Sequence, residues 1–96
     1  MKTPEQSAEI RDQIKDDNLH ALMFDGCDAA LLGPCRQHGG HTLALYSYTA
    51  LVEVFVQQLK DADDPYTAAL EWVETNVVSA SMGPMTPVIL YDYADA

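Results

Sequence analysis

The segment 65–80 constrains the fold of this chain most, because it combines a helical apolar pattern with clear boundaries. Five apolar side chains fall at positions i, i+3, i+4, i+7 and i+11, which places them on one face of a helix. They are Tyr66, Ala69, Leu70, Val73 and Val77. Asp64 is a good N-cap, Pro65 suits the first turn, and Gly83 is followed by a proline that ends the pattern. We therefore predict a helix here that packs against another layer.

Residues 48–60 repeat this spacing, although three valines in the segment also alternate as in a strand. The repeated positions are Tyr48, Leu51, Val52, Phe55 and Leu59. Ser47 is a suitable N-cap, and the length of the segment favours a helix.

Residues 3–17 predict a further helix, with Thr3 as N-cap, Pro4 in the first turn and Gln6 completing a capping box. Its apolar stripe is thin, and a marginal helix needs packing to persist. We describe residues 1–18 as an N-terminal helical extension, and the sequence leaves open whether it packs on its own core or on a partner.

Three other segments predict strands. Residues 29–36 and 41–46 flank a Gly-Gly turn, so we expect them to pair as an antiparallel hairpin. Residues 86–91 contain a continuous apolar run, which suggests a central or well-covered strand.

The resulting order α-β-β-α-α-β predicts an α+β fold, with a small antiparallel or mixed three-stranded sheet and helices on one face. We expect one core domain over residues 19–91 and an acidic tail over residues 92–96.

Charge is the strongest signal in the composition, because fifteen Asp and Glu face five Lys and Arg and give a formal charge of −10. Beyond residue 36 only Lys60 faces eight carboxylates. Such a chain repels nucleic acid and anionic membranes, so we expect neither as a direct partner. A basic protein partner fits this charge, and so does a simple requirement for solubility.

The chain has no run approaching the about 20 apolar residues of a membrane span, and its N-terminus is too polar for a signal peptide. Two cysteines are too few for a disulfide scaffold. We therefore expect a cytoplasmic protein with free thiols.

Cys27, Cys35, His38 and His41, with His20 nearby, form the richest group of metal-ligand types. Their spacing does not match a standard zinc finger, and the histidines flank a Gly-Gly turn, where exposed side chains are common. Two interpretations therefore remain: these side chains are simply packed or exposed, or they form a zinc-binding module. A Cys–His nucleophile pair would additionally need the thiol and imidazole in contact.

The sequence has no phosphate-binding loop, nucleophile elbow or zinc-protease motif. Its many carboxylates form pairs by chance, and the segment 61–64 lacks the glycine and glutamate of a calcium loop. We therefore expect no enzyme and no cofactor.

Several motifs together resemble a group of short, uncharacterised proteins encoded by bacteriophages. They are Phe24-Asp25-Gly26-x-Asp28-x-Ala30-x-x-Gly33, Tyr46-Ser47-Tyr48 before an apolar helix, Ala68 or Ala69 to Glu71, Asn76-Val77, Gly83 and Thr86-Pro87-Val88. The similarity covers residues 23–91 and implies a phage origin, but it implies no activity, no catalytic residues and no role for the cysteines and histidines.

These observations give three hypotheses. The first is a phage protein that binds and inhibits or modulates a host protein with a basic surface, such as a CRISPR effector, where its acidic face would mimic nucleic acid. The expected contact residues are Asp61, Asp63, Asp64, Glu71, Trp72 and Glu74. The others are the zinc module and a minor phage structural or assembly protein that forms homo-oligomers. All three place the protein in the host cytoplasm.

Overall fold

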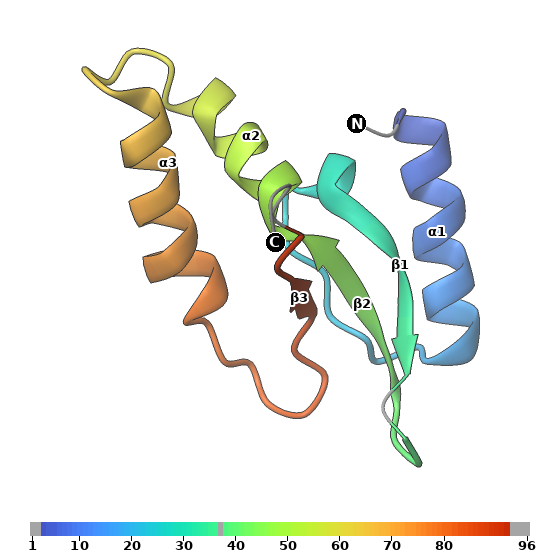
Figure 1. Ribbon diagram of the computed structural model, residues 1–96. Coiled ribbons are helices and arrows are strands. Elements are labelled where there is room, and N and C mark those ends of the chain that lie inside the picture. The colour runs from blue at the N-terminus through green and yellow to red at the C-terminus, as the bar shows by residue number, and fades with distance from the viewer. Residues whose placement is uncertain (1–2, 37, 93–96) are drawn as a thin grey trace.

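The computed structural model describes residues 3–36 and 38–92 of the 96-residue chain. In this part of the chain the helices are α1 (Pro4–Asp17), α2 (Tyr48–Gln58) and α3 (Pro65–Val73), and the strands are β1 (Leu31–Arg36), β2 (Thr42–Ser47) and β3 (Val88–Leu90). A 3₁₀ turn, η1 (Asp28–Ala30), precedes β1, and a π-helical turn, η2 (Glu74–Val78), extends α3. The predicted α+β fold and its α-β-β-α-α-β order are confirmed (Figure 1).

The sheet is mixed and has β2 at its centre, in the order β1-β2-β3. β1 and β2 pair antiparallel, as the hairpin prediction required, and β3 pairs parallel to β2. The parallel pairing follows from the connection, because α2 and α3 carry the chain back to the starting end of the sheet. The prediction of a central β3 is wrong. Its apolar run is short and lies at an edge, and Leu90 is 46% exposed.

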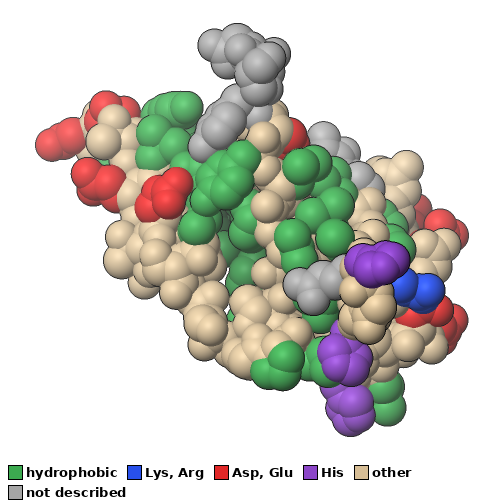
Figure 2. Space-filling model, turned by 60° about the horizontal axis from the view of Figure 1, so that its bottom comes forward, with side chains coloured by type: hydrophobic (Ala, Val, Ile, Leu, Met, Phe, Trp, Pro, Cys, Tyr) green, Lys and Arg blue, Asp and Glu red, His purple; other side chains and the backbone are tan. Residues whose placement is uncertain are grey.

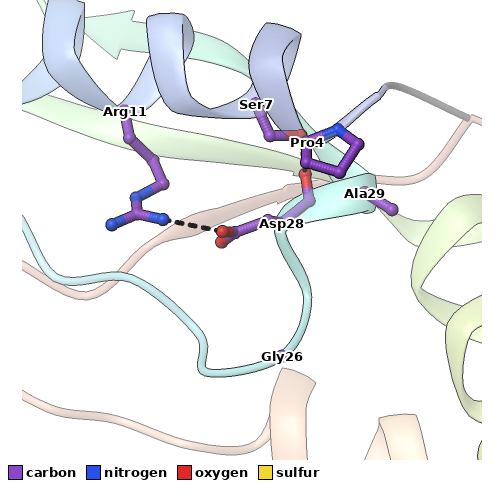
Figure 3. Close-up of a pocket in the computed structure, with 6 residues that line it drawn as sticks. All are labelled: Pro4, Ser7, Arg11, Gly26, Asp28 and Ala29. Atoms are coloured by element: carbon purple, nitrogen blue, oxygen red, sulfur yellow. Dashed lines mark hydrogen bonds and ion pairs between the residues drawn. The ribbon is translucent and has the colours of Figure 1, made fainter.

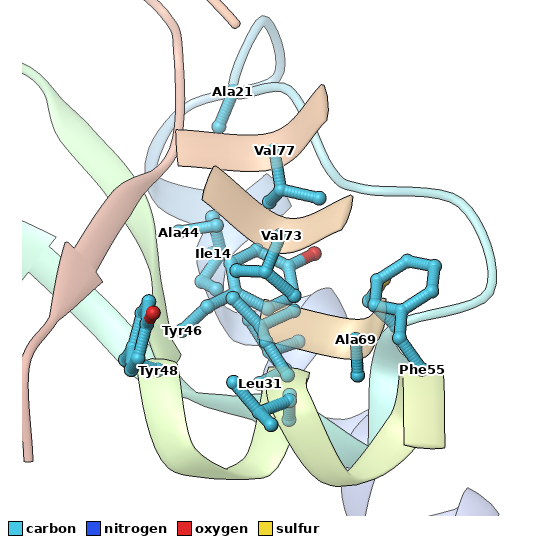
Figure 4. Close-up of a cluster of buried hydrophobic side chains, with 14 residues drawn as sticks. Ile14, Ala21, Leu31, Ala44, Tyr46, Tyr48, Phe55, Ala69, Val73 and Val77 are labelled. Carbon is cyan, nitrogen blue, oxygen red and sulfur yellow. The ribbon is translucent and has the colours of Figure 1, made fainter. Parts of the chain in front are cut away.

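One face of the sheet is covered by the helices, and the core lies between them. Successive side chains on a strand point to opposite faces, so Ala44 and Tyr46 of β2 both face the helices, and both are fully buried. Ile14 of α1 and Val73 of α3 belong to the same buried cluster (Figure 4). Tyr46 is its largest side chain. Its hydroxyl accepts a hydrogen bond from the Phe24 amide at 3.0 Å, so this polar atom is paired inside the core.

The opposite face of the sheet, which we call the open sheet face, carries apolar side chains at the alternate positions. They are Cys35, Leu43, Leu45, Val88 and Leu90. In Figure 2 hydrophobic side chains gather over the sheet, between the acidic end of the molecule at the left and the histidines at the lower right. Leu43 is nearly buried, whereas Leu90 is about half exposed.

α1 packs on its own core, which answers the question that its thin apolar stripe left open. The predicted capping box of Thr3 and Gln6 is present. Ile14 is completely buried, and the buried Ser7 hydroxyl donates to the Asp28 carbonyl at 2.8 Å. The Asn18 side-chain amide donates to the Thr42 carbonyl at 2.9 Å. The helix that the sequence suggested as an extension therefore contributes to the core.

The C-terminal part of the chain is also fastened to the core. Asp92 accepts hydrogen bonds from the Ser47 hydroxyl at 2.5 Å and from the Thr49 amide at 3.1 Å, at the start of α2. Partial burial tends to raise the pKa of Asp92, but these hydrogen bonds outweigh it and hold the pKa below its usual value. Asp92 was expected in the acidic tail, and the remainder of that tail, 93–96, lies outside the described residues.

The long helix predicted over 65–80 is α-helical to Val73 and continues as the π-helical turn to Val78, several residues before Gly83. Within the described residues, no helix has both the length and the apolar character needed to cross a membrane.

Candidate interaction surfaces around α2 and α3

The loop between α2 and α3 holds the first three of the predicted contact residues. Asp61 and Asp63 are exposed there, and neither side chain has a hydrogen bond or ion pair within the described structure. Asp64 is instead the N-cap of α3, as predicted from its position. The Thr67 hydroxyl donates to it at 2.7 Å and the Thr67 amide at 3.3 Å, and these bonds lower the pKa of Asp64. Asp64 therefore stabilises the helix start.

The other three predicted contact residues lie on different sides of α3. At 100° per residue, Trp72 and Glu74 are about 200° apart around the axis, so they point to opposite flanks. Glu71 points outward between them and is exposed. Glu74 accepts a hydrogen bond from the Tyr48 hydroxyl at 2.8 Å, which joins α3 to α2. The structure thus divides the predicted set, and one partner surface cannot cover Trp72 and Glu74 equally.

Trp72 is 46% exposed, so about half of its side chain is accessible on the surface of α3. Its ring lies 6.1 Å from the ring of Phe55, measured between centroids. It borders a cleft of about 410 Å³, which we call the Trp72 cleft. The cleft is lined by Met23, Phe24, Asp25, Cys27, Phe55, Trp72, Asn76, Val77 and Met82.

On the opposite flank, α2 and α3 enclose a groove of about 440 Å³, which we call the α2–α3 groove. It is lined by Tyr48, Thr49, Val52, Glu53, Val56, Tyr66 and Leu70. The sequence pattern assigned Tyr66 and Leu70 to the core, yet Tyr66 is 55% exposed and Leu70 is only partly buried. One sequence signal pointed to this groove. Val56 lies at i+4 from Val52, so it extends the apolar face of α2 beyond the predicted stripe.

The positive charges of the protein lie mainly at the other end of the molecule, around α1. Arg11 pairs with Asp28 at 2.8 Å, and Arg36 pairs with Asp17 at 3.3 Å. The Lys15 ammonium donates to backbone carbonyls after α1. These three cations bind groups near α1, so they do not neutralise the carboxylates of α2 and α3. Acidic side chains gather at that end of the molecule (Figure 2).

The pocket between α1 and η1 shows how Arg11 is used. It has a volume of about 380 Å³ and is lined by Pro4, Ser7, Arg11, Gly26, Asp28 and Ala29 (Figure 3). Arg11 crosses it to reach the Asp28 carboxylate, and Ser7 holds the Asp28 carbonyl. Both hydrogen bonds join α1 to η1. The charged side chains of this pocket, Arg11 and Asp28, therefore help to hold α1 in place.

The zinc prediction is not supported by where the structure places the cysteines. Cys27 is buried in the core, whereas Cys35 lies on the open sheet face, and His38 and His41 are exposed at the hairpin turn. Over residues 3–36 and 38–92, no three His, Cys, Asp or Glu side chains are grouped closely enough to hold a metal ion. These residues are near in sequence, but Cys27 lies before η1, Cys35 in β1, and His38 and His41 in the turn between β1 and β2.

Cys27 is also poorly suited to nucleophilic chemistry. Burial raises the pKa of its thiol to about 11, and the carboxylates of Asp28 and Asp25 contribute to the rise. Because the thiolate is both the nucleophile and the metal ligand, this environment keeps the sulfur unreactive near neutral pH.

Comparisons of this chain with protein family models, with curated proteins and with solved structures found no match. The similarity to bacteriophage proteins therefore stays a prediction from the sequence motifs.

Proposed function

We propose that this protein is a non-catalytic binding protein of phage origin that occupies a basic surface on a host protein. The observation that carries the proposal is the distribution of charge: α2, α3, their loop and η2 together carry six carboxylates and one lysine, while the arginines are paired with carboxylates around α1. Such an arrangement attracts a positively charged surface over a distance of about one Debye length, roughly 8–10 Å in ordinary salt.

The contact residues we propose are Asp61, Asp63 and Glu71, which we call the acidic ridge, with Trp72 beside them. The three carboxylates of the ridge are exposed and are not used to hold the fold. A partly exposed tryptophan at the border of a charged region is typical of interface hot spots. Asp64 and Glu74, in contrast, already hold α3 through Thr67 and Tyr48.

The partner we propose is a host complex that binds nucleic acid, such as a CRISPR effector. Its binding site presents Lys and Arg for phosphates, and a row of carboxylates can satisfy the same cations. The proposal therefore also predicts competition: DNA or RNA should displace this protein from the partner.

The test is affinity capture from host lysate at low salt, followed by mass spectrometry and elution with increasing salt. The wild-type protein should retain a basic nucleic-acid-binding protein, and the triple variant Asp61→Asn, Asp63→Asn, Glu71→Gln should not. The matched control is Glu9→Gln, Asp12→Asn, Asp16→Asn on α1, which removes the same number of exposed carboxylates and should retain the partner.

If the two triple variants lose the partner equally, only net charge matters and the acidic ridge is not the contact surface. If the wild-type chain retains no basic protein at low salt, the proposed function is wrong.

A minor phage assembly protein is the second candidate, and the open sheet face favours it. Leu45 and Val88, which are partly exposed, and the half-exposed Leu90 present a surface without charged side chains. An assembly protein should form stable homo-oligomers through this face, and Leu45→Lys should dissociate them. Light scattering that finds a monomer at all accessible concentrations would exclude this candidate.

A further inference from the structure

We infer that the α2–α3 groove binds a short segment of the partner that carries an aliphatic side chain next to an Arg or Lys. The inference rests on the proposed function, since it assumes a basic partner, and it names the surface and the chemistry of the contacted segment. It places the main apolar contact outside the residue set expected from the sequence.

The floor of the groove supplies an apolar site of suitable size. Val52 and Val56 lie one helical turn apart on α2, and Leu70 faces them from α3. Tyr66, with 55% of its surface exposed, forms a wall near the start of α3. An amphipathic segment placed in such a groove buries apolar side chains one turn apart, the usual mode of helix-in-groove recognition.

The rim of the groove supplies the charge that selects a cationic segment. Glu53 is the one charged side chain among the described lining residues. Two further carboxylates are bonded to the lining: Glu74 accepts from the Tyr48 hydroxyl at 2.8 Å, and Asp92 accepts from the Thr49 amide at 3.1 Å. The groove therefore combines an apolar floor with one carboxylate in its lining and two more bonded to lining residues.

This combination distinguishes the groove from the other apolar surfaces of the molecule. The open sheet face has no charged residue within its strand positions, so nothing there selects one partner over another. In the α2–α3 groove an Arg or Lys that follows an aliphatic anchor can bury its alkyl stem on Val56 or Leu70 and place its charged end at Glu53. A purely apolar or acidic segment would leave Glu53 without compensation or would repel it.

The test uses a defined probe, a short alanine-based amidated peptide with two leucines one helical turn apart, each followed by an arginine. A second peptide with serine in place of both leucines keeps the charge and lacks the anchors. Each is titrated into the ¹⁵N-labelled full chain, and amide shift changes locate the contact. We expect the leucine peptide to perturb Glu53, Val56 and Leu70 most, and the serine peptide to bind more weakly.

Two pairs of variants provide matched controls. Tyr66→Ala should weaken binding of the leucine peptide about five- to thirty-fold, because Tyr66 forms a wall of the groove. Leu19→Ala removes an exposed apolar side chain that follows α1, away from the groove, and should leave the affinity unchanged. Glu53→Gln should weaken binding about two- to five-fold, whereas Glu71→Gln, on the solvent side, should have a smaller effect.

Three results would overturn the inference. They are shift changes centred on the loop 61–64, equal binding of the two peptides, and equal effects of Tyr66→Ala and Leu19→Ala. None of these contradicts the proposed function, because a basic host protein could still be retained through the acidic ridge. Failure of both peptides to bind, together with a failed lysate capture at low salt, would remove the inference and the proposed function together.

Discussion

Replacing Ile14 by alanine should destabilise the whole protein, because the structure makes α1 part of the core. Ile14 has no exposed surface and belongs to the cluster shared by the sheet and α3 (Figure 4). The substitution removes three carbon atoms, worth about 2.4 kcal/mol at about 0.8 kcal/mol each. The cavity left behind adds to this, so we expect a loss of about 2–5 kcal/mol.

This loss is large compared with the total stability expected for such a domain, about 5–15 kcal/mol. For a protein of this size, each kcal/mol lowers Tm by about 4–8 °C, so the variant should melt at least about 8 °C lower. Alanine is a better helix former than isoleucine, so weakened helix propensity cannot explain the effect. Any loss therefore reports lost packing between α1 and the core.

Urea unfolding followed by far-UV circular dichroism and by Trp72 fluorescence measures this effect. The two signals should change together in one transition that shifts to lower urea in Ile14→Ala. Gln13→Ala, at the exposed neighbouring position of α1, should change stability by no more than about 0.5 kcal/mol. A loss below about 1 kcal/mol for Ile14→Ala, or a separate early loss of helix signal, would show that α1 is only loosely attached.

Three further outcomes are expected. Tyr46→Phe should cost about 1–3 kcal/mol in urea unfolding, since it leaves the Phe24 amide without its acceptor. Asp92→Asn should remove a pH-dependent contribution to Tm. The folded-state pKa of Asp92 lies below the ordinary value of 3.8 for an aspartate, so this contribution is present above that value and is lost as the pH falls through the folded pKa. Cys35 should react with a thiol reagent in the native protein at neutral pH, whereas Cys27 should react only on unfolding, since burial raises the pKa of its thiol to about 11. Native labelling of both thiols at equal rates would contradict this assignment.

Much of the fold could be predicted, because the residues that begin each helix can be recognised from their neighbours in the sequence. Thr3, Ser47 and Asp64 cap the three helices as their residue types suggested, and a Gly-Gly turn joins the hairpin strands. A helix cap is satisfied within three residues of the chain, so sequence alone can identify it.

The position of β3 could not be predicted in this way. A run of apolar residues shows that both faces of a strand are apolar. It does not show how many neighbouring strands there are, so an edge strand and a central strand can have the same pattern. Only the return of the chain through α2 and α3 places it beside β2.

The candidate site was predicted in composition but not in arrangement. The sequence identified the acidic segment after residue 36 and the exposed loop carboxylates, since charge and loop position are local properties. It could not show that Trp72 and Glu74 point to opposite flanks, nor that Glu74 is bonded to Tyr48. It also missed the α2–α3 groove, because a groove exists only after two helices are placed side by side.

The sequence by itself determined the element order, the helix caps and the strong negative charge of the chain, since each depends on neighbouring residues or on composition. The tertiary structure decided which carboxylates hold the fold and which face solvent, that α1 joins the core through Ile14, and that Cys27 and Cys35 lie apart. These outcomes depend on contacts between segments distant along the chain, and the burial that they produce sets the environment of each side chain.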